Sequence, residues 1–191
     1  MTLNEEKKLL LRALARDSSA SSDFDLNPET ILAQNRALRA AAVLVPLRET
    51  DSGLQVVLTK RSSALKHHPG QICFPGGKVE ETDRDVTAAA LREAHEEIGL
   101  EPGQVQLLGA LPGHETVTGF TMSPIVGLIG TKFSPRPDPG EVAEVFEVPL
   151  SHVSDPNRFL VQSRRWRGER RYYYTVPWGP YYIWGATARI L

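Results

Sequence analysis

Three glutamates within five residues form the part of this 191-residue sequence with the clearest chemical meaning. Glu93, Glu96 and Glu97 stand at positions i, i+3 and i+4, which share one face if the segment is helical. Like charges at this spacing repel one another and destabilise a helix. Carboxylate oxygens are also the ligands that hard divalent cations prefer. The cluster is therefore either a solvated charged face or a metal site.

The residues ahead of the cluster favour the metal site. The stretch FPGGKVEETD, residues 74–83, contains the adjacent glycines Gly76 and Gly77, whose backbone can adopt conformations closed to other residues. A solvated face usually alternates its charges and needs no special turn before it. A glycine turn that leads into an acid-bearing helix is typical of a site for metal-bound phosphates.

The helix that must position the glutamates has clear boundaries. Thr82 or Asp83 can cap its N-terminus, with Asp85 in the first turn. Gly99 is placed to end it in a left-handed conformation. One apolar face consists mainly of small side chains: Val86, Ala89, Ala90, Ala94 and Ile98. We expect this face to lie close to a sheet, with the glutamates directed towards another surface.

Segments rich in β-branched residues and bounded by Gly, Pro or Asp predict the strands of that sheet. They occupy residues 41–48, 53–61, 105–111, 120–130 and 141–150. A hairpin turning at Arg167-Gly168 is expected near the C-terminus, and residues 183–191 predict a strand end followed by a short helix. The chain is therefore expected to be rich in strands from residue 41 onwards.

Residues 1–38 are expected to form a helical extension and linker ahead of a single domain at residues 39–191. Residues 4–16 place leucines among charges, a pattern typical of an amphipathic helix. We expect this helix to pack on the domain or on a dimer partner, because Glu5 and Glu6 interrupt the basic face that membrane-surface helices use. Pro28 is placed to open a second short helix over residues 28–38.

Composition excludes several classes of function. With a net charge of -1, the chain has no positive field to attract nucleic acid or an anionic membrane. It has no apolar run long enough to span a bilayer, and its charged N-terminus does not resemble a cleaved leader. The single cysteine, Cys73, excludes an internal disulfide. A cytoplasmic protein with a small-molecule partner is predicted.

Residues 76–100, GGKVEETDRDVTAAALREAHEEIGL, resemble the signature of the Nudix hydrolases. The core of that signature, Arg-Glu-aliphatic-x-Glu-Glu-x-Gly-aliphatic, is matched at Arg92, Glu93, Ala94, Glu96, Glu97, Gly99 and Leu100. Lys78 and Arg84 stand where the family pattern has a glycine and a glutamate. Because the loop is one residue longer, Gly77 and Asp83 take those parts. The resemblance implies an α/β fold, the Nudix α/β/α sandwich with a mixed β-sheet.

A second signature lies upstream. Residues 58–78, LTKRSSALKHHPGQICFPGGK, resemble the motif that precedes the Nudix box in coenzyme A diphosphatases. The matching positions are Thr59, Arg61, Ser62, Gly70, Phe74, Pro75, Gly76 and Gly77. Lys66 stands where an arginine is usual, which keeps the charge and loses the bidentate fork.

Together the signatures imply hydrolysis of coenzyme A or its acyl derivatives to 3',5'-ADP and 4'-phosphopantetheine or acyl-phosphopantetheine. Mg2+ or Mn2+ would be bound by Glu93, Glu96 and Glu97, and Arg92 would orient Glu96. Glu141 is the candidate general base, preferred to Glu144, with a solvated surface role as its alternative. Substrate contacts are expected from Thr59, Arg61, Lys66, Gln71, Gly76 and Gly77.

Two rival functions stay open. The first is a Nudix hydrolase of ADP-ribose or another nucleoside diphosphate derivative, which would give a different product pattern. The second is a non-catalytic nucleotide-sensing Nudix domain, but such domains commonly lack one of the helix glutamates, and all three are present here. A zinc-protease interpretation of His95-Glu96 fails, because Gly99 occupies the place of the required second histidine.

The remaining polar and aromatic features receive structural interpretations. His67, His68 and His114 are expected in loops, with the first two near substrate. Cys73 is expected to be a small buried side chain and not a nucleophile. The arginines of residues 164–171 are expected to form a solvated face, with phosphate or nucleic-acid binding as the alternative. The tyrosine-rich strands are candidates for core or for a homodimer interface.

Overall fold

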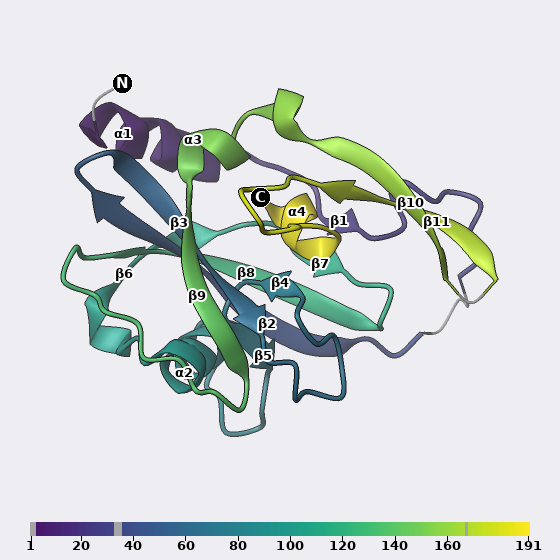
Figure 1. The fold of residues 1–191 in the computed structure, drawn as a ribbon, viewed down its shortest axis with the longest axis horizontal. Coiled ribbons are helices and arrows are strands. Elements are labelled where there is room, and N and C mark those ends of the chain that lie inside the picture. Colours follow the sequence, from purple (N-terminus) through teal and green to yellow (C-terminus); the bar gives the residue numbers. More distant parts are fainter. Residues whose placement is uncertain (1–2, 33–35, 167) are drawn as a thin grey trace.

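The computed structural model describes residues 3–32, 36–166 and 168–191, and a mixed sheet forms its centre (Figure 1). Its strands are β1 Ser21–Ser22, β2 Arg39–Thr50, β3 Gly53–Arg61, β4 Ile72–Cys73, β5 Gly76–Lys78, β6 Val105–Ala110, β7 His114–Glu115, β8 Phe120–Ile129 and β9 Val142–Pro149. The order is β1-β7-β8-β2-β3-β4, with β5 beside β2, β6 beside β8 and β9 beside β3. The β2–β8 and β1–β7 pairs are parallel, and the other pairs are antiparallel.

Helices lie on both faces of this sheet (Figure 1). They are α1 Leu3–Leu14, α2 Val86–Ile98, α3 Leu150–Val153 and α4 Ala186–Ile190, with short 3-10 helices at Pro102–Gln104 and Pro156–Arg158. Helix α2 packs on one face, whereas α1, α3 and α4 pack on the other, together with the hairpin of β10 Leu160–Trp166 and β11 Glu169–Thr175. The predicted α/β/α sandwich and N-terminal helix are confirmed. The C-terminal hairpin is confirmed through the pairing of β10 with β11, whereas residue 167 of its predicted turn lies outside the described residues.

Two apolar clusters separate these layers, and β2 contributes to both because successive strand residues point to opposite faces. Val43 and Val45 join the cluster beneath α1, which adds Leu10 and Leu14. Leu44 joins the cluster beneath α2. The α2 members of that cluster have no solvent exposure: Ala89, Ala90, Ala94 and Ile98. Small side chains at this interface hold α2 against the sheet, and its glutamates therefore lie next to the edge strand β5.

Helix α2 begins later than predicted. Its N-cap is Asp85, whose carboxylate accepts a hydrogen bond from the Ala88 backbone N–H at 2.8 Å. Neither Thr82 nor Asp83 caps it, because both precede the first turn and the Asp83 carboxylate is bound elsewhere. Gly99 ends the helix with φ 68°, so the predicted left-handed C-terminus is confirmed.

Replacing the cap gives a testable effect on stability. Asp85→Ala is expected to lower the free energy of unfolding, because the hydrogen bond to the Ala88 N–H is lost. Asp85→Asn keeps an acceptor at the same place and is expected to retain most of that stability. Urea unfolding of the two variants checks this. An equal loss in both would show that the charge of Asp85 matters and its hydrogen bond does not.

The second predicted helix, over residues 28–38, is wrong wherever the structure describes that segment. The Thr30 N–H donates to the Asn27 carbonyl at 3.0 Å, which closes a single turn, and Ile31 is 97% exposed. A short helix with no apolar face to bury is marginal in water. Residues 33–35 of the prediction lie outside the described residues.

Asn27 instead fixes the extension to the hairpin. Its Nδ2 donates to the Tyr172 carbonyl at 3.0 Å, and the Tyr172 N–H donates to Asn27 Oδ1 at 2.8 Å. The buried amide thus pairs with β11 in the way that a strand residue would. The expectation that the extension packs on the domain is supported by this contact and by α1.

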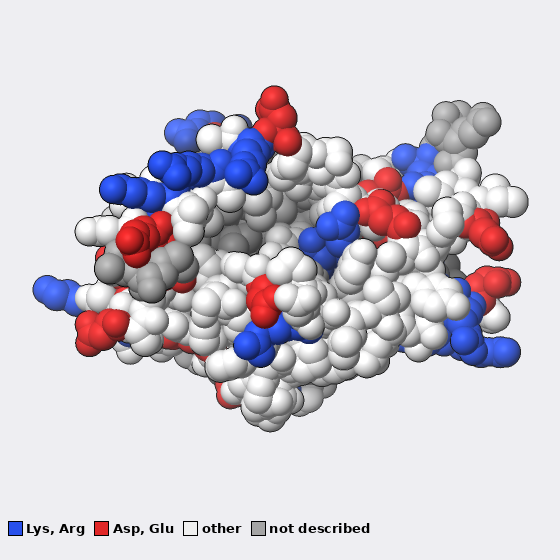
Figure 2. All heavy atoms as spheres, turned by 90° about the horizontal axis from the view of Figure 1, so that it is seen from above, with Lys and Arg blue, Asp and Glu red and all other residues white. Residues whose placement is uncertain are grey.

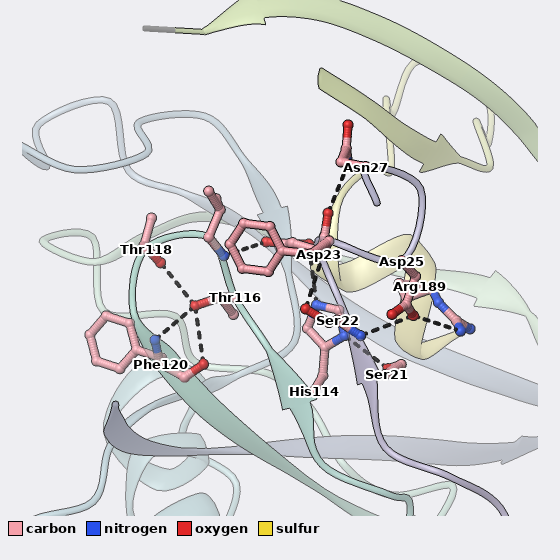
Figure 3. A network of polar contacts seen from close by, with 12 residues as sticks. Ser21, Ser22, Asp23, Asp25, Asn27, His114, Thr116, Thr118, Phe120 and Arg189 are labelled. Carbon is pink, nitrogen blue, oxygen red and sulfur yellow. Dashed lines mark hydrogen bonds and ion pairs between the residues drawn. The ribbon is translucent and has the colours of Figure 1, made fainter. Parts of the chain in front are cut away.

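His114 is a buried strand residue, so its predicted place in a loop is wrong. The parallel pairing of β1 with β7 encloses its ring, which has no solvent exposure. Nδ1 is hydrogen-bonded with Ser21 Oγ at 2.9 Å and Nε2 with Asp23 Oδ1 at 3.2 Å (Figure 3). The other Asp23 oxygen accepts from the Val117 N–H at 2.8 Å. This network joins the extension to β7 and to the loop that follows it.

Surface charge agrees with the balanced composition. On the face shown in Figure 2, the described Lys and Arg side chains stand in separate groups beside Asp and Glu, with wide uncharged areas between them. Among the described residues, none of the helices combines the length and the apolar character needed to cross a bilayer.

Candidate active site

Two of the three helix glutamates turn back towards the glycine strand β5. Glu97 is buried, with 2% exposure, and its Oε2 accepts a hydrogen bond from the Gly76 N–H at 3.3 Å. Glu93 lies against Gly77 so closely that a Cβ at Gly77 would come within 2.4–2.7 Å of its carboxyl atoms. Gly77 therefore leaves room for the Glu93 carboxylate beside β5, and the backbone N–H of Gly76 binds that of Glu97.

Burial and mutual repulsion make these carboxylates hard to ionise. Burial, followed by the charge of Glu93, raises the pKa of Glu97 to about 8. Burial also raises the pKa of Glu93, and the charges of Glu96 and Glu141 add to this effect against the lowering effect of Arg92. A cation bound between the carboxylates would relieve the repulsion, so the site has the electrostatic character of a metal site.

Arg92 binds three carboxylates around this site. Its Nη1 donates to Glu93 Oε1 at 3.1 Å and to Glu96 Oε2 at 3.0 Å, which includes the contact predicted from the sequence. Its Nε and Nη2 donate to the two oxygens of Asp83, both at 3.0 Å. Asp83 stands where the family pattern places an outlying acid, and in this structure its carboxylate holds the Arg92 guanidinium in position.

The three glutamates do not converge as one set of ligands. Across the described residues, no group of three His, Cys, Asp or Glu side chains is arranged to hold a metal ion. Glu96 is 54% exposed and directed to Arg92. The donor chemistry nevertheless fits a hard cation such as Mg2+ or Mn2+, because Glu93 and Glu97 present carboxylate oxygens in a crowded, partly buried site. Glu96 would join them by turning away from Arg92.

The two candidate bases differ in their surroundings. Glu141 is exposed directly before β9, and its charge contributes to the raised pKa of both Glu93 and Glu97, which brings its carboxylate into their electrostatic range. Glu144 accepts a hydrogen bond from the Tyr181 hydroxyl instead. Of the two, Glu141 is therefore the one whose charge reaches the helix glutamates.

A cavity of about 650 Å³ opens beside the Gly76-Gly77 strand. We call it the basic cavity. It lies between strands β2, β5 and β8 and the hairpin, and it is lined by, among others, Asp23, Arg39, Arg61, His67, His68, Gln71, Gly76, Gly77, Lys78, Arg164, Arg171 and Trp184. The glycine strand thus borders both the carboxylates and the basic cavity.

Four of the six predicted substrate contacts line the basic cavity: Arg61, Gln71, Gly76 and Gly77. Thr59 does not. Its side chain has no exposure and its hydroxyl donates to the Cys73 carbonyl at 3.2 Å, so it links β3 to β4. Lys66 is exposed in the loop after β3 and is not part of the lining. The predicted position of His67 and His68 near the substrate agrees with their place in the lining.

Cys73 is partly buried and lines the basic cavity, so its predicted burial is only partly correct, but its thiol is hard to ionise. Burial raises the pKa of its thiol to about 11, and Sγ lies 3.3 Å from the Thr59 hydroxyl. At pH 8 the fraction of Cys73 present as thiolate is then about a hundredfold below that of an unfolded thiol. The thiolate is the reactive form of cysteine. Alkylation by iodoacetamide is expected to be slower by about this factor in native protein than in urea. Equal rates would mean that the thiol is accessible and ionises normally.

Comparisons with known proteins agree with this geometry. A family model described as the NUDIX domain matches residues 38–172. The uncharacterized Nudix hydrolase NudL of Enterobacter sp. (strain 638) is 44% identical over 154 residues, which cover 80% of this chain and 79% of that protein. The NudL of Cronobacter sakazakii (strain ATCC BAA-894) is 42% identical over the same shares.

The fold is shared with solved structures as well. The Nudix hydrolase RenU from M. smegmatis matches with a TM-score of 0.52 and 20% identity, over 64% of this chain and 83% of that one. Helix α2 and the glycine strand lie within the region that the family model matches. The chain therefore belongs to the Nudix family and is a hydrolase that acts on diphosphate bonds.

Proposed function

We propose that this Nudix hydrolase cleaves the diphosphate bond of coenzyme A or its derivatives, releasing 3',5'-ADP and 4'-phosphopantetheine or its acyl form. The observation that carries the proposal is the place of the upstream motif. Arg61 and Gln71, which belong to the stretch that resembles coenzyme A diphosphatases, line the basic cavity next to the glycine strand. A diphosphate at the glutamates would thus have its nucleotide beside cationic side chains.

The described side chains divide the chemistry between them. Nudix hydrolases generally use divalent metal ions, and Mg2+ or Mn2+ bound by Glu93, Glu96 and Glu97 would supply charge neutralisation and Lewis acidity. Arg92 orients Glu93 through its hydrogen bond, and it holds Glu96 until that side chain turns to the metal. Glu97 is fixed by burial and by the Gly76 N–H. We assign Glu141 the role of accepting the proton of the attacking water.

The proposal extends to the domain organisation, the compartment and the oligomeric state of the protein. Residues 39–191 form the Nudix hydrolase domain, and residues 1–38 form its N-terminal helical extension and linker. The protein acts in the cytoplasm. A homodimer is supported by exposed apolar side chains on β10, where Leu160 and Val161 are each 54% exposed. Sedimentation of the purified protein tests the dimer, and a single species of monomer mass over a wide concentration range would remove it.

Product analysis tests the substrate. The protein is incubated with coenzyme A or with ADP-ribose in Mg2+ or Mn2+, and the products are separated by chromatography. We expect 3',5'-ADP from coenzyme A, loss of that product in Glu96→Gln, and normal turnover in Glu81→Gln, whose exposed side chain lies outside the cluster. Cleavage of ADP-ribose alone would overturn the substrate and leave the hydrolase. Binding of either compound without cleavage would favour a nucleotide-sensing role.

A further inference from the structure

The hairpin places two arginines in the basic cavity. Arg164 of β10 and Arg171 of β11 are directly opposite partners, and both line the cavity. The adjacent pair, Arg165 and Arg170, points to the other side of the hairpin because strand side chains alternate, and it is exposed. Arg164 is exposed as well, so the expected solvated face is correct for these three arginines, whereas Arg171 is half-buried. We call the two cavity-lining arginines, Arg164 and Arg171, the inner pair.

Aromatic rings hold the guanidinium groups of this inner pair. Arg164 lies over the ring of Trp184, with 4.2 Å from Cζ to the ring centroid, and Arg171 lies over Phe24 at 4.9 Å. Such stacking leaves the N–H groups at the edge of each guanidinium able to bind a further partner. Burial lowers the pKa of Arg171, and the charge of Arg164 lowers it further. Two like charges directly opposite each other also destabilise a hairpin, and a bound anion would remove this cost.

A third arginine belongs to the same charged region. Arg61 ends β3 and lines the cavity, and its buried Nε has no hydrogen-bond partner in the described part of the chain. A buried donor without a partner is costly, so it points to a group that the protein binds. His68 lies within the electrostatic range of two of the arginines. Burial lowers its pKa, and the charges of Arg61 and Arg164 lower it further. Its backbone is held at φ 54°, a conformation that histidine rarely adopts.

The cavity has a large excess of positive charge. Among its described lining residues, five are lysine or arginine and one, Asp23, is a carboxylate. Both oxygens of Asp23 already have partners in the network of Figure 3, one at His114 and one at the Val117 N–H. Asp23 favours the charged form of Arg171 but cannot neutralise the whole cavity. A ligand with at least two negative charges in this region would balance the arginines.

We propose that Arg61, Arg164 and Arg171 bind a phosphomonoester on the nucleotide half of the substrate, the 3'-phosphate of coenzyme A, and so select substrates that carry it. The inference rests on the proposed function, because it presumes that the diphosphate lies at the glutamates. A phosphomonoester is separate from that diphosphate and carries close to two charges at neutral pH. Its three terminal oxygens suit the planar donor groups of arginine.

Discrimination between coenzyme A and 3'-dephospho-coenzyme A tests the inference. The wild-type protein is expected to have the higher kcat/KM for coenzyme A. Loss of one charge-assisted phosphate contact in Arg164→Gln or Arg171→Gln should reduce the ratio of the two kcat/KM values by about tenfold or more, mainly through KM. The matched control is Arg165→Gln, which removes the same charge from the outer face of the hairpin and should keep the wild-type ratio. Thermal melting of each variant verifies that it is folded.

A binding measurement keeps this inference separate from the proposed function. Titration calorimetry with 3',5'-ADP and with 5'-AMP needs no turnover, and it reports the contribution of the 3'-phosphate directly. We expect tighter binding of 3',5'-ADP, and a loss of that preference in Arg164→Gln but not in Arg165→Gln. If coenzyme A is not cleaved and the preference persists, the proposed function fails and the phosphate site stands. Equal binding of the two nucleotides by the wild-type protein, or equal effects of the inner and outer arginines, would overturn the phosphate site.

Discussion

Glu97→Gln is expected to reduce kcat by about a thousandfold and, at the same time, to stabilise the metal-free protein. Activity falls because a neutral amide is a poor ligand for a hard cation. Stability rises because Glu97 is 2% exposed and lies among other carboxylates, so its ionisation is unfavourable in the folded state. Glu97→Gln is thus predicted to lower kcat and to raise the free energy of unfolding of the metal-free protein, so the catalytic role of the carboxylate and its effect on stability can be measured separately.

The pH dependence has a definite sign. The pKa of Glu97 is raised from its ordinary value of 4.5 to about 8, so the folded protein keeps a proton that the unfolded chain releases between these values. Stability of the metal-free wild type should fall as the pH rises from about 4.5 to about 8 and then level off. In Glu97→Gln this decline should be smaller, with Tm higher by several degrees at pH 8.

Melting curves from pH 4 to pH 9 in the presence of EDTA measure this effect. Glu81→Gln, which removes an exposed carboxylate outside the cluster, serves as the control. Superimposable profiles of Tm against pH for Glu97→Gln and the wild type would show that ionisation of Glu97 does not destabilise the folded protein. Full activity of Glu97→Gln would remove it from the metal site.

Gly77→Ala is expected to lower kcat/KM by about a hundredfold while the protein stays folded. The three atoms nearest a Cβ at Gly77 all belong to the carboxyl group of Glu93, which is the end of a flexible side chain and can move aside. Displacing a ligand by about 1 Å is enough for a loss of this size. Gly76→Ala provides the contrast. Its Cβ would lie 2.4 Å from the Ala42 carbonyl oxygen and 2.6 Å from Val43 Cα, both in the backbone of β2.

Because backbone cannot move aside, Gly76→Ala should lose about 3 kcal/mol or more of unfolding free energy. Gly76 also has φ 156°, which other residues rarely adopt. Urea unfolding and coenzyme A hydrolysis, measured on both variants, separate a defect in folding from a defect in chemistry. If Gly77→Ala were fully active, the close approach of Glu93 to β5 would not be needed for catalysis.

Local signals in the sequence were sufficient for the main elements. The β-branched runs predicted β2, β3, β6, β8 and β9, because their side chains form the two apolar clusters of the sheet. Gly99 predicted the end of α2, because glycine adopts the left-handed conformation of a helix C-terminus without steric cost. The N-cap was mistaken because several capping residues stand close together, and the choice depends on Arg92, which binds Asp83 from nine positions further along the chain.

Features that depend on distant partners could not be predicted. Asn27 binds Tyr172, 145 positions away, and His114 binds Asp23, 91 positions away. Neither residue type indicates such a partner. Alternation along a strand predicts that Arg164 and Arg171 share a face, but only the packed hairpin shows that this face meets a cavity. The contact of Glu96 with Arg92 spans only four positions and was predictable from helical spacing, unlike these distant partners.

The amide of Asn27 ties the extension to the strand that carries Arg171, and Arg189 of α4 forms an ion pair with Asp25 in the same extension. Asp23 of the extension and residues between 164 and 187 therefore line the basic cavity together with the glycine strand, whereas the glutamates come from the middle of the chain. In a lineage built on this plan, the catalytic centre could be inherited intact while the flanking ends diverge. New substrates would then be acquired by remodelling the ends of the gene, without touching the residues that perform hydrolysis.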